Sequence, residues 1–260
     1  MIRSPHLPPL RRTPVGHARL RRAGGLRAAA RRLRRSTSGL ALIEFALSLP
    51  PMLALGVYGL ETTNYALTQL KVSQIALNLA DTASRTGVAA QLSTSQLREF
   101  DVNDIFQGVR IQGQGIQLTT QGRIILSSLE NIQQSYDTAG PVQRIHWQRC
   151  LGKQSGPGYD SSYGSTSTAA GSDNKVGNAG ITVPNGIGDN PASMVTAPAG
   201  AGVMFVEINY QYKPLIGSFF LGSPRIHYIA SFIVRDRRDF SQLFNPAPAA
   251  AQSTCDKYTA

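Results

Sequence analysis

The sequence predicts an α+β protein in which an N-terminal transmembrane helix continues into an amphipathic helix, packed on an antiparallel sheet of about four to five strands. Apolar and helical patterns fill the first part of the chain, and strand patterns with partial alternation fill the rest. Helices followed by a run of strands favour α+β over a doubly wound sheet. We expect a leader over residues 1–39, a transmembrane helix over 40–60 and a folded body over 61–260.

The positive charge of the chain is confined to the leader. The 260 residues carry a net charge of +11, and residues 1–39 hold eleven arginines with no lysine, aspartate or glutamate. The remaining chain has 15 basic and 15 acidic side chains. A body without net charge argues against a nucleic-acid-binding surface. Residues 1–35 are rich in proline and poor in apolar side chains, so we expect a disordered arm that could contact anionic lipid headgroups.

The segment 40–60, LALIEFALSLPPMLALGVYGL, has 21 residues and a single charge, Glu44. A helix of that length reaches roughly 30 Å, which matches the hydrocarbon core of a bilayer. Arginines precede the segment and Glu61 follows it, so the positive-inside rule places the N-terminus in the cytoplasm. A buried core helix, a cleaved secretory signal and a mitochondrial transit peptide are the alternatives. Glu44 itself is either an acid that reaches the headgroups or a functional carboxylate.

The region 36–87 resembles the amino-terminal part of the TadE-like family, pilin-like (pseudopilin) proteins of the bacterial tight-adherence pilus. The resemblance lies in Gly39, in Glu44 with its aromatic neighbour Phe45, in the Leu-Pro pair at 49–50 and in the polar amphipathic helix that follows. A weaker likeness continues through GRIILSSLE and RIHWQRC. The long leader and the consecutive prolines Pro50 and Pro51 depart from a typical pilin, and Pro51 favours a kink.

The resemblance implies cleavage by a prepilin peptidase between Gly39 and Leu40. It also implies that Glu44 is either presented to that peptidase or neutralises the new amino group of a neighbouring subunit. The protein would be a single-pass component of the bacterial inner membrane, with its C-terminal body in the periplasm. Its partners would be other pilus or pseudopilin subunits and the assembly machinery.

Two helices are expected at the start of the body. Tyr65, Thr68, Val72, Ile75, Leu79 and Ala83 recur at helical spacing, up to a stop at Gly87. This stripe packs either on the protein's own sheet or on neighbouring subunits. A second, short helix is expected within QLREFDVNDIFQ, with Leu97, Phe100, Ile105 and Phe106 on its apolar side.

Strands are expected at about 115–120, 123–130, 142–150, 203–212 and 225–236, because these segments carry β-branched and aromatic residues with partial alternation. Residues 152–202 contain 11 glycines, 7 serines and 4 prolines, which predicts a long surface insertion. The insertion is either a flexible loop or a surface that binds a partner.

The two cysteines, Cys150 and Cys255, suggest a disulfide outside the cytoplasm, and two unpaired thiols are the alternative. No phosphate-binding loop, nucleophile elbow or metal-ligand spacing occurs in the sequence, and His146 and His227 are interpreted as structural or surface residues. We therefore expect no catalytic residues, no metal, no cofactor and no small-molecule substrate.

The leading hypothesis is a non-enzymatic structural component of pilus assembly or secretion. The second is an adhesin-like envelope module that binds through the Gly/Ser-rich insertion. An exported hydrolase is a third hypothesis, which no motif supports.

Overall fold

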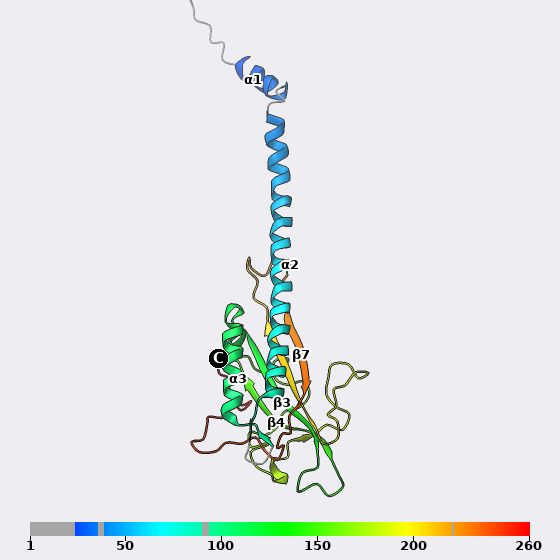
Figure 1. Cartoon of the computed structure of the whole chain (residues 1–260). Helices are drawn as coiled ribbons and strands as arrows, with labels where there is room; N and C mark the ends of the chain where they lie inside the picture. Colours follow the sequence, from blue (N-terminus) through cyan, green and yellow to red (C-terminus); the bar gives the residue numbers. More distant parts are fainter. Residues whose placement is uncertain (1–23, 36–38, 90–93, 220) are drawn as a thin grey trace, which may run out of the picture. The chain divides into compact units, whose positions relative to one another are not determined.

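Five antiparallel strands form the centre of the folded body in the computed structural model, which describes residues 24–35, 39–89, 94–219 and 221–260 (Figure 1). The chain divides into two units, Met1–Leu55 and Gly56–Ala260, and the second holds the sheet. The α+β prediction is confirmed. The elements in chain order are α1 (Gly24–Arg35), α2 (Leu40–Arg85), β1 (Val88–Ala89), β2 (Ser95–Gln96), α3 (Glu99–Gly113), η2 (Gln114–Ile116), α4 (Leu118–Gln121), β3 (Gly122–Ile132), β4 (Val142–Leu151), η3 (Val176–Asn178), β5 (Ile181–Thr182), β6 (Gly202–Gln211) and β7 (Arg225–Ile233).

Helix α1 corrects the expectation of disorder as far as residue 35. Its sequence, GGLRAAARRLRR, is built mainly from alanine, leucine and arginine, which all have high helix propensity. The prediction of disorder rested on the composition of residues 1–35 as a whole, in which this short helix-forming stretch does not stand out. The remainder of the predicted disordered arm, residues 1–23, lies outside the described residues.

Helix α2 contains 46 residues and changes character along its length. It is long and apolar enough to cross a membrane, and no residue in its most apolar stretch is buried. Its second part buries Val72, Ile75, Leu79 and Ala83 in the core of the body, each at most 2% exposed. The predicted stripe therefore packs on the protein's own sheet. The helix continues through both prolines of the apolar segment.

Helix α3 is the predicted second helix, but it begins at Glu99 and runs longer than expected. Phe106 is fully buried as predicted, whereas Phe100 is 57% exposed, so its assignment to the apolar side was wrong. The predicted strand at 115–120 is also wrong, because η2 and α4 occupy that stretch. The backbone at Gln117 adopts a left-handed φ of 53°, which interrupts an extended path, and Leu118 then enters the core.

The sheet has the order β5-β4-β3-β6-β7, and every adjacent pair is antiparallel. β3 lies at its centre, where Leu126 is opposite Arg149 of β4 and Val206 of β6. A register shift follows Ser128 on β3. β3, β4, β6 and β7 correspond to four predicted strands. The two-residue β5 was not predicted.

Both faces of the sheet are covered. Helices α2 and α3 lie over one face (Figure 1), and their buried apolar side chains form a core cluster with those of the sheet. The other face carries Leu129, Ile145 and Phe205, and residues of the 152–202 insertion cover it. Among them, Ile187 and Ala197 are 2% and 4% exposed, respectively. The insertion is therefore more than a surface loop, because its scattered apolar residues complete the second half of the core.

Candidate functional site

The residues of the predicted processing site lie at the beginning of α2. Gly39 immediately precedes the helix, and Leu40 is its first residue. Leu40 and Glu44 are four residues apart, so they share one face of the helix. Leu40 and Phe45 are 56% and 60% exposed, and Glu44 is exposed as well. The Gly39–Leu40 peptide bond, where cleavage is predicted, thus lies at the start of a helix. The first turns of this helix expose apolar side chains and one carboxylate.

Glu61 was considered in the sequence only as an acidic flank, yet the structure gives it a specific set of partners. Its side chain has no exposed surface. The carboxylate accepts a hydrogen bond of 2.5 Å from the Tyr212 hydroxyl, and further bonds from the backbone N–H groups of Leu215 and Ile216. The hydrogen bond from Tyr212 lowers the pKa of Glu61, and the two backbone hydrogen bonds lower it further. Burial acts in the opposite direction, but the pKa stays below its ordinary value. Burial, followed by the bond to Glu61, raises the pKa of Tyr212 to about 12.

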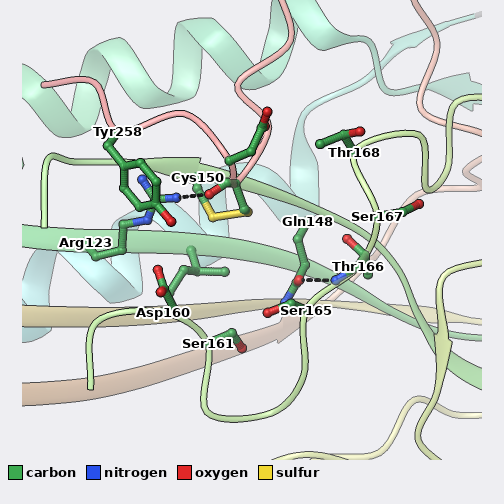
Figure 2. A pocket seen from close by; sticks show the side chains of 13 residues that line it. Arg123, Gln148, Cys150, Asp160, Ser161, Ser165, Thr166, Ser167, Thr168 and Tyr258 are labelled. Atoms are coloured by element: carbon green, nitrogen blue, oxygen red, sulfur yellow. Dashed lines mark hydrogen bonds between the residues drawn. A yellow bond between two sulfur atoms is a disulfide. The ribbon is translucent and has the colours of Figure 1, made fainter. Parts of the chain in front are cut away.

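Cys150 and Cys255 form a disulfide that lines a cavity of about 330 Å³ in the body (Figure 2). That volume lies at the lower end of the range of small-molecule sites. The insertion supplies one wall and the C-terminal tail another. The polar side chains on these walls are Asp160, Ser161, Ser165, Thr166, Ser167, Thr168, Asp256 and Tyr258.

Arg123 of β3 lies beneath this cavity and is fully buried. Its guanidinium donates hydrogen bonds to the backbone carbonyls of Gly152, Cys255 and Lys257, and the Tyr258 ring lies 4.4 Å from its Cζ atom (Figure 2). Burial lowers the pKa of Arg123. Because carbonyls take most of its donors, this arginine fixes the C-terminal tail in place, with only Nε left without a hydrogen bond.

The cavity walls can offer hydroxyl donors and acceptors, carboxylate acceptors and one aromatic ring to a ligand. Gln148 orders the wall that the insertion forms, since it donates to the Gly164 carbonyl and accepts from the backbone N–H of Thr166 (Figure 2). Hydroxyls, carboxylates and an aromatic face are groups that can hydrogen-bond and stack with a polyhydroxylated molecule.

The two histidines of the sheet have acidic or amide partners that the sequence did not indicate. His146 Nδ1 lies 2.9 Å from Glu130 in the buried core. His227 lies 2.6 Å from Asn209 Oδ1 and 3.2 Å from Asp189 Oδ1. Within residues 24–35, 39–89, 94–219 and 221–260, the structure has no cluster of three or more potential metal ligands. His6 and His17 lie outside the described residues.

The sequence suggested the disulfide that the structure contains, and its processing site stays a prediction, but sequence reasoning missed Glu61, Arg123 and the cavity. Glu61 and Tyr212 are 151 residues apart, and no local pattern marks such a pair. The only sequence signal for Glu61 was the position of its carboxylate directly after the apolar segment 40–60. Comparison with protein-family models, with curated proteins and with solved structures finds no match to this chain.

Proposed function

We propose that this protein is a membrane-anchored, pseudopilin-like structural component of tight-adherence pilus assembly or secretion, without enzymatic activity. The division of α2 carries the proposal. One half of the helix exposes a continuous apolar surface, and the other half buries a stripe against the antiparallel sheet. Such a helix serves as an anchor in lipid and as part of a folded core outside it. The family resemblance of residues 36–87 supplies the biological role and the proposed partners, which are other pilus or pseudopilin subunits and the assembly machinery.

Charge and cysteine use support an orientation for this anchor. Arg31, Arg32 and Arg34 are exposed on α1, just before the apolar segment. The positive-inside rule then keeps the N-terminus in the cytoplasm and carries the body across the inner membrane into the periplasm. A disulfide between Cys150 and Cys255 suits that oxidising compartment.

The processing step can be tested on protein purified from its native host. We expect mass spectrometry of the mature chain to find Leu40 at the N-terminus, as a prepilin peptidase would leave it. A Gly39→Lys variant is expected to retain the leader. A native protein that still begins before Leu40 would show that this cleavage does not take place.

The assembly role can be tested at Glu44. We expect Glu44→Ala to leave membrane insertion intact and to abolish pili, because the carboxylate would lose its role toward a neighbouring subunit. The matched control is Ser48→Ala, which alters a small polar side chain one turn further along the same helix face. Normal piliation in the Glu44 variant would contradict the role given to this residue.

A second candidate function, an adhesin-like envelope module, is favoured by the cavity that the insertion forms. Removing the whole insertion would uncover the core around Leu129 and Phe205, so a substitution tests the idea more cleanly. Ser165→Trp is expected to fill the cavity and weaken adhesion while pili still assemble. Ser172→Trp, at an exposed position of the insertion outside the cavity, is the control. Unchanged adhesion in the Ser165 variant would exclude the cavity as the binding site.

A further inference from the structure

The loop between β6 and β7 lies at one end of the body (Figure 1), and several of its large apolar side chains are exposed. Leu215, Ile216 and Phe219 are 68%, 48% and 88% exposed, although they lie within five residues of one another. Lys213 is the only charged residue between positions 213 and 224. Concentrated apolar exposure of this kind marks a surface that meets another apolar phase.

Glu61 fixes the backbone of this loop to helix α2. Its carboxylate oxygen Oε2 lies 3.1 Å and 3.2 Å from the backbone nitrogens of Leu215 and Ile216, respectively. The Tyr212 hydroxyl, at the base of the loop, donates to the same carboxylate and accepts from the Asn64 side chain at 2.7 Å. Every one of these residues belongs to the unit Gly56–Ala260. The position of the loop along the helix is therefore set by several hydrogen bonds.

Glu61 is also the first residue after the 21-residue apolar segment 40–60. Each helical residue advances only 1.5 Å along the axis, so a backbone bonded to Glu61 lies within a few ångströms of the depth at which the segment ends. Leu60, the residue directly before Glu61 on α2, is 64% exposed. The apolar loop and the end of the apolar segment thus occupy the same level.

We propose that the β6–β7 loop is a second membrane contact, with Leu215, Ile216 and Phe219 entering the lipid interface where α2 leaves the bilayer. This inference rests on the proposed membrane span. Apolar side chains of interfacial segments enter roughly 5–10 Å into the boundary between headgroups and acyl chains. The loop adds a second point of attachment, so the body is held against the membrane and does not turn freely on a single helix.

A lipid surface explains the loop better than a protein partner does. The buried carboxylate of Glu61 ties the loop to the membrane-proximal end of the helix, and a bilayer is the apolar phase that a spanning segment brings to that level. A docking surface for another subunit would need no such alignment with the end of the apolar segment. Contact with another subunit is an outcome that the experiment below distinguishes.

The test places a nitroxide spin label on the loop of the full chain in phosphatidylcholine–phosphatidylglycerol vesicles. Both native cysteines are in the disulfide, so Ser218→Cys supplies a single reactive thiol and leaves the three apolar side chains intact. Frequent collisions of the label with oxygen indicate that it lies in lipid, and frequent collisions with a water-soluble nickel chelate indicate that it lies in water. Leu55→Cys serves as the reference within the apolar segment, and Val176→Cys, 74% exposed on the insertion, serves as the aqueous reference.

We expect the label at position 218 to resemble the Leu55 reference, with oxygen collisions favoured over nickel collisions. A label at 55 in lipid combined with a label at 218 in water would overturn the loop contact and leave the span standing. A label at 55 in water would refute the span and the loop contact together. Protection of position 218 from both reagents would show that another protein covers the loop, and would also overturn the inference.

The contribution of the apolar side chains is tested in the same labelled chain. Leu215→Ser combined with Phe219→Ser is expected to abolish the preference for oxygen at position 218, while labels at position 55 remain in lipid. Ile111→Ser removes an apolar side chain of similar exposure, 66%, from α3 and is expected to change neither signal. An unchanged signal at 218 in the double variant would contradict the role given to these residues.

Discussion

Glu99 and Arg149 form a salt bridge in which neither side chain has any exposed surface. Arg149 Nε lies 2.9 Å and 3.0 Å from the two carboxylate oxygens, and its guanidinium also donates to the carbonyl of Gln148. The bridge connects the first turn of α3 to β4. Removal of one partner leaves the other charge buried in the core without compensation. Substitution of either residue is therefore expected to destabilise the fold strongly.

We predict that Glu99→Ala lowers the free energy of unfolding by about 3–5 kcal/mol. Urea unfolding of the full chain in detergent can be followed by the fluorescence of Trp147, the one tryptophan in the sequence. Asp81→Ala is the control, since it breaks an exposed pair with Arg85 and should cost at most about 0.5 kcal/mol. Similar losses in both variants would contradict the importance given to burial.

Glu61 gives the β6–β7 loop a dependence on pH. Its folded-state pKa lies below the ordinary value of 4.5, so its stabilising contribution is fully present above that pH. The contribution is lost as the pH falls through the lowered folded-state pKa. Protonation removes the negative charge that the Tyr212 hydroxyl and the two backbone N–H groups stabilise.

We therefore predict that the amides of Leu215 and Ile216 lose protection from hydrogen exchange in acid, measured relative to their intrinsic rates. In Glu61→Gln the protection at these amides should be weaker at neutral pH and should no longer change with acid. The Tyr212 amide, which donates to the Pro224 carbonyl, is an internal control at the base of the loop. Equal protection of Leu215 at all pH values in the unmodified chain would argue against the carboxylate contact.

At the scale of elements, the second half of α2 provides the clearest test of packing. Ile75 is 1% exposed within the core, whereas Leu70 on the same helix is 58% exposed. We predict that Ile75→Ala costs about 2–5 kcal/mol, and that Leu70→Ala stays within about 0.5 kcal/mol of the parent. Urea unfolding measures both. Little effect from Ile75→Ala would favour the alternative in which this stripe contacts neighbouring subunits.

The elements that could be predicted are those whose pattern extends over many residues. α2 and four strands have a period that repeats long enough to distinguish helix from sheet. The segment around Ile116 and Leu118 was misassigned because a short apolar run does not separate the two, and Gln117 turns left-handed. β5 has two residues, too few for any period to be detected.

The parts of the candidate sites that escaped prediction depend on contacts between distant residues. Ile187 and Val195 look like scattered apolar residues in a polar insertion, and only the sheet face opposite α2 and α3 shows that Ile187 belongs to the core and that Val195 packs against it. Arg123 meets its carbonyl partners near residue 257 through the tertiary fold. By contrast, the spacing of Gly39 and Glu44 is local, so the sequence alone could suggest it.

At the scale of the whole molecule, the disulfide joins the end of β4 to the C-terminal tail across a separation of 105 residues. Closing so long a loop stabilises the fold mainly by restricting the unfolded chain. We predict that replacing Cys150 and Cys255 together by serine lowers the free energy of unfolding by up to about 4–5 kcal/mol. Reduction of the parent chain should produce the same loss, and reductant should leave the double variant unchanged. A reductant effect on the double variant would point to another cause.

The attachment of the tail to β3 and β4 determines when the body can finish folding. Backbone bonds join Cys150 to Ser253 and Gly152 to Thr259, and two of the three carbonyls that accept hydrogen bonds from Arg123 belong to that same tail. During synthesis, β3 and β4 are complete about a hundred residues before the tail to which they bind. Until that tail is available, the guanidinium of Arg123 lacks the carbonyls of Cys255 and Lys257 that help to compensate its burial, so a chain that ends before residue 253 is expected to be cleaved more readily by proteases.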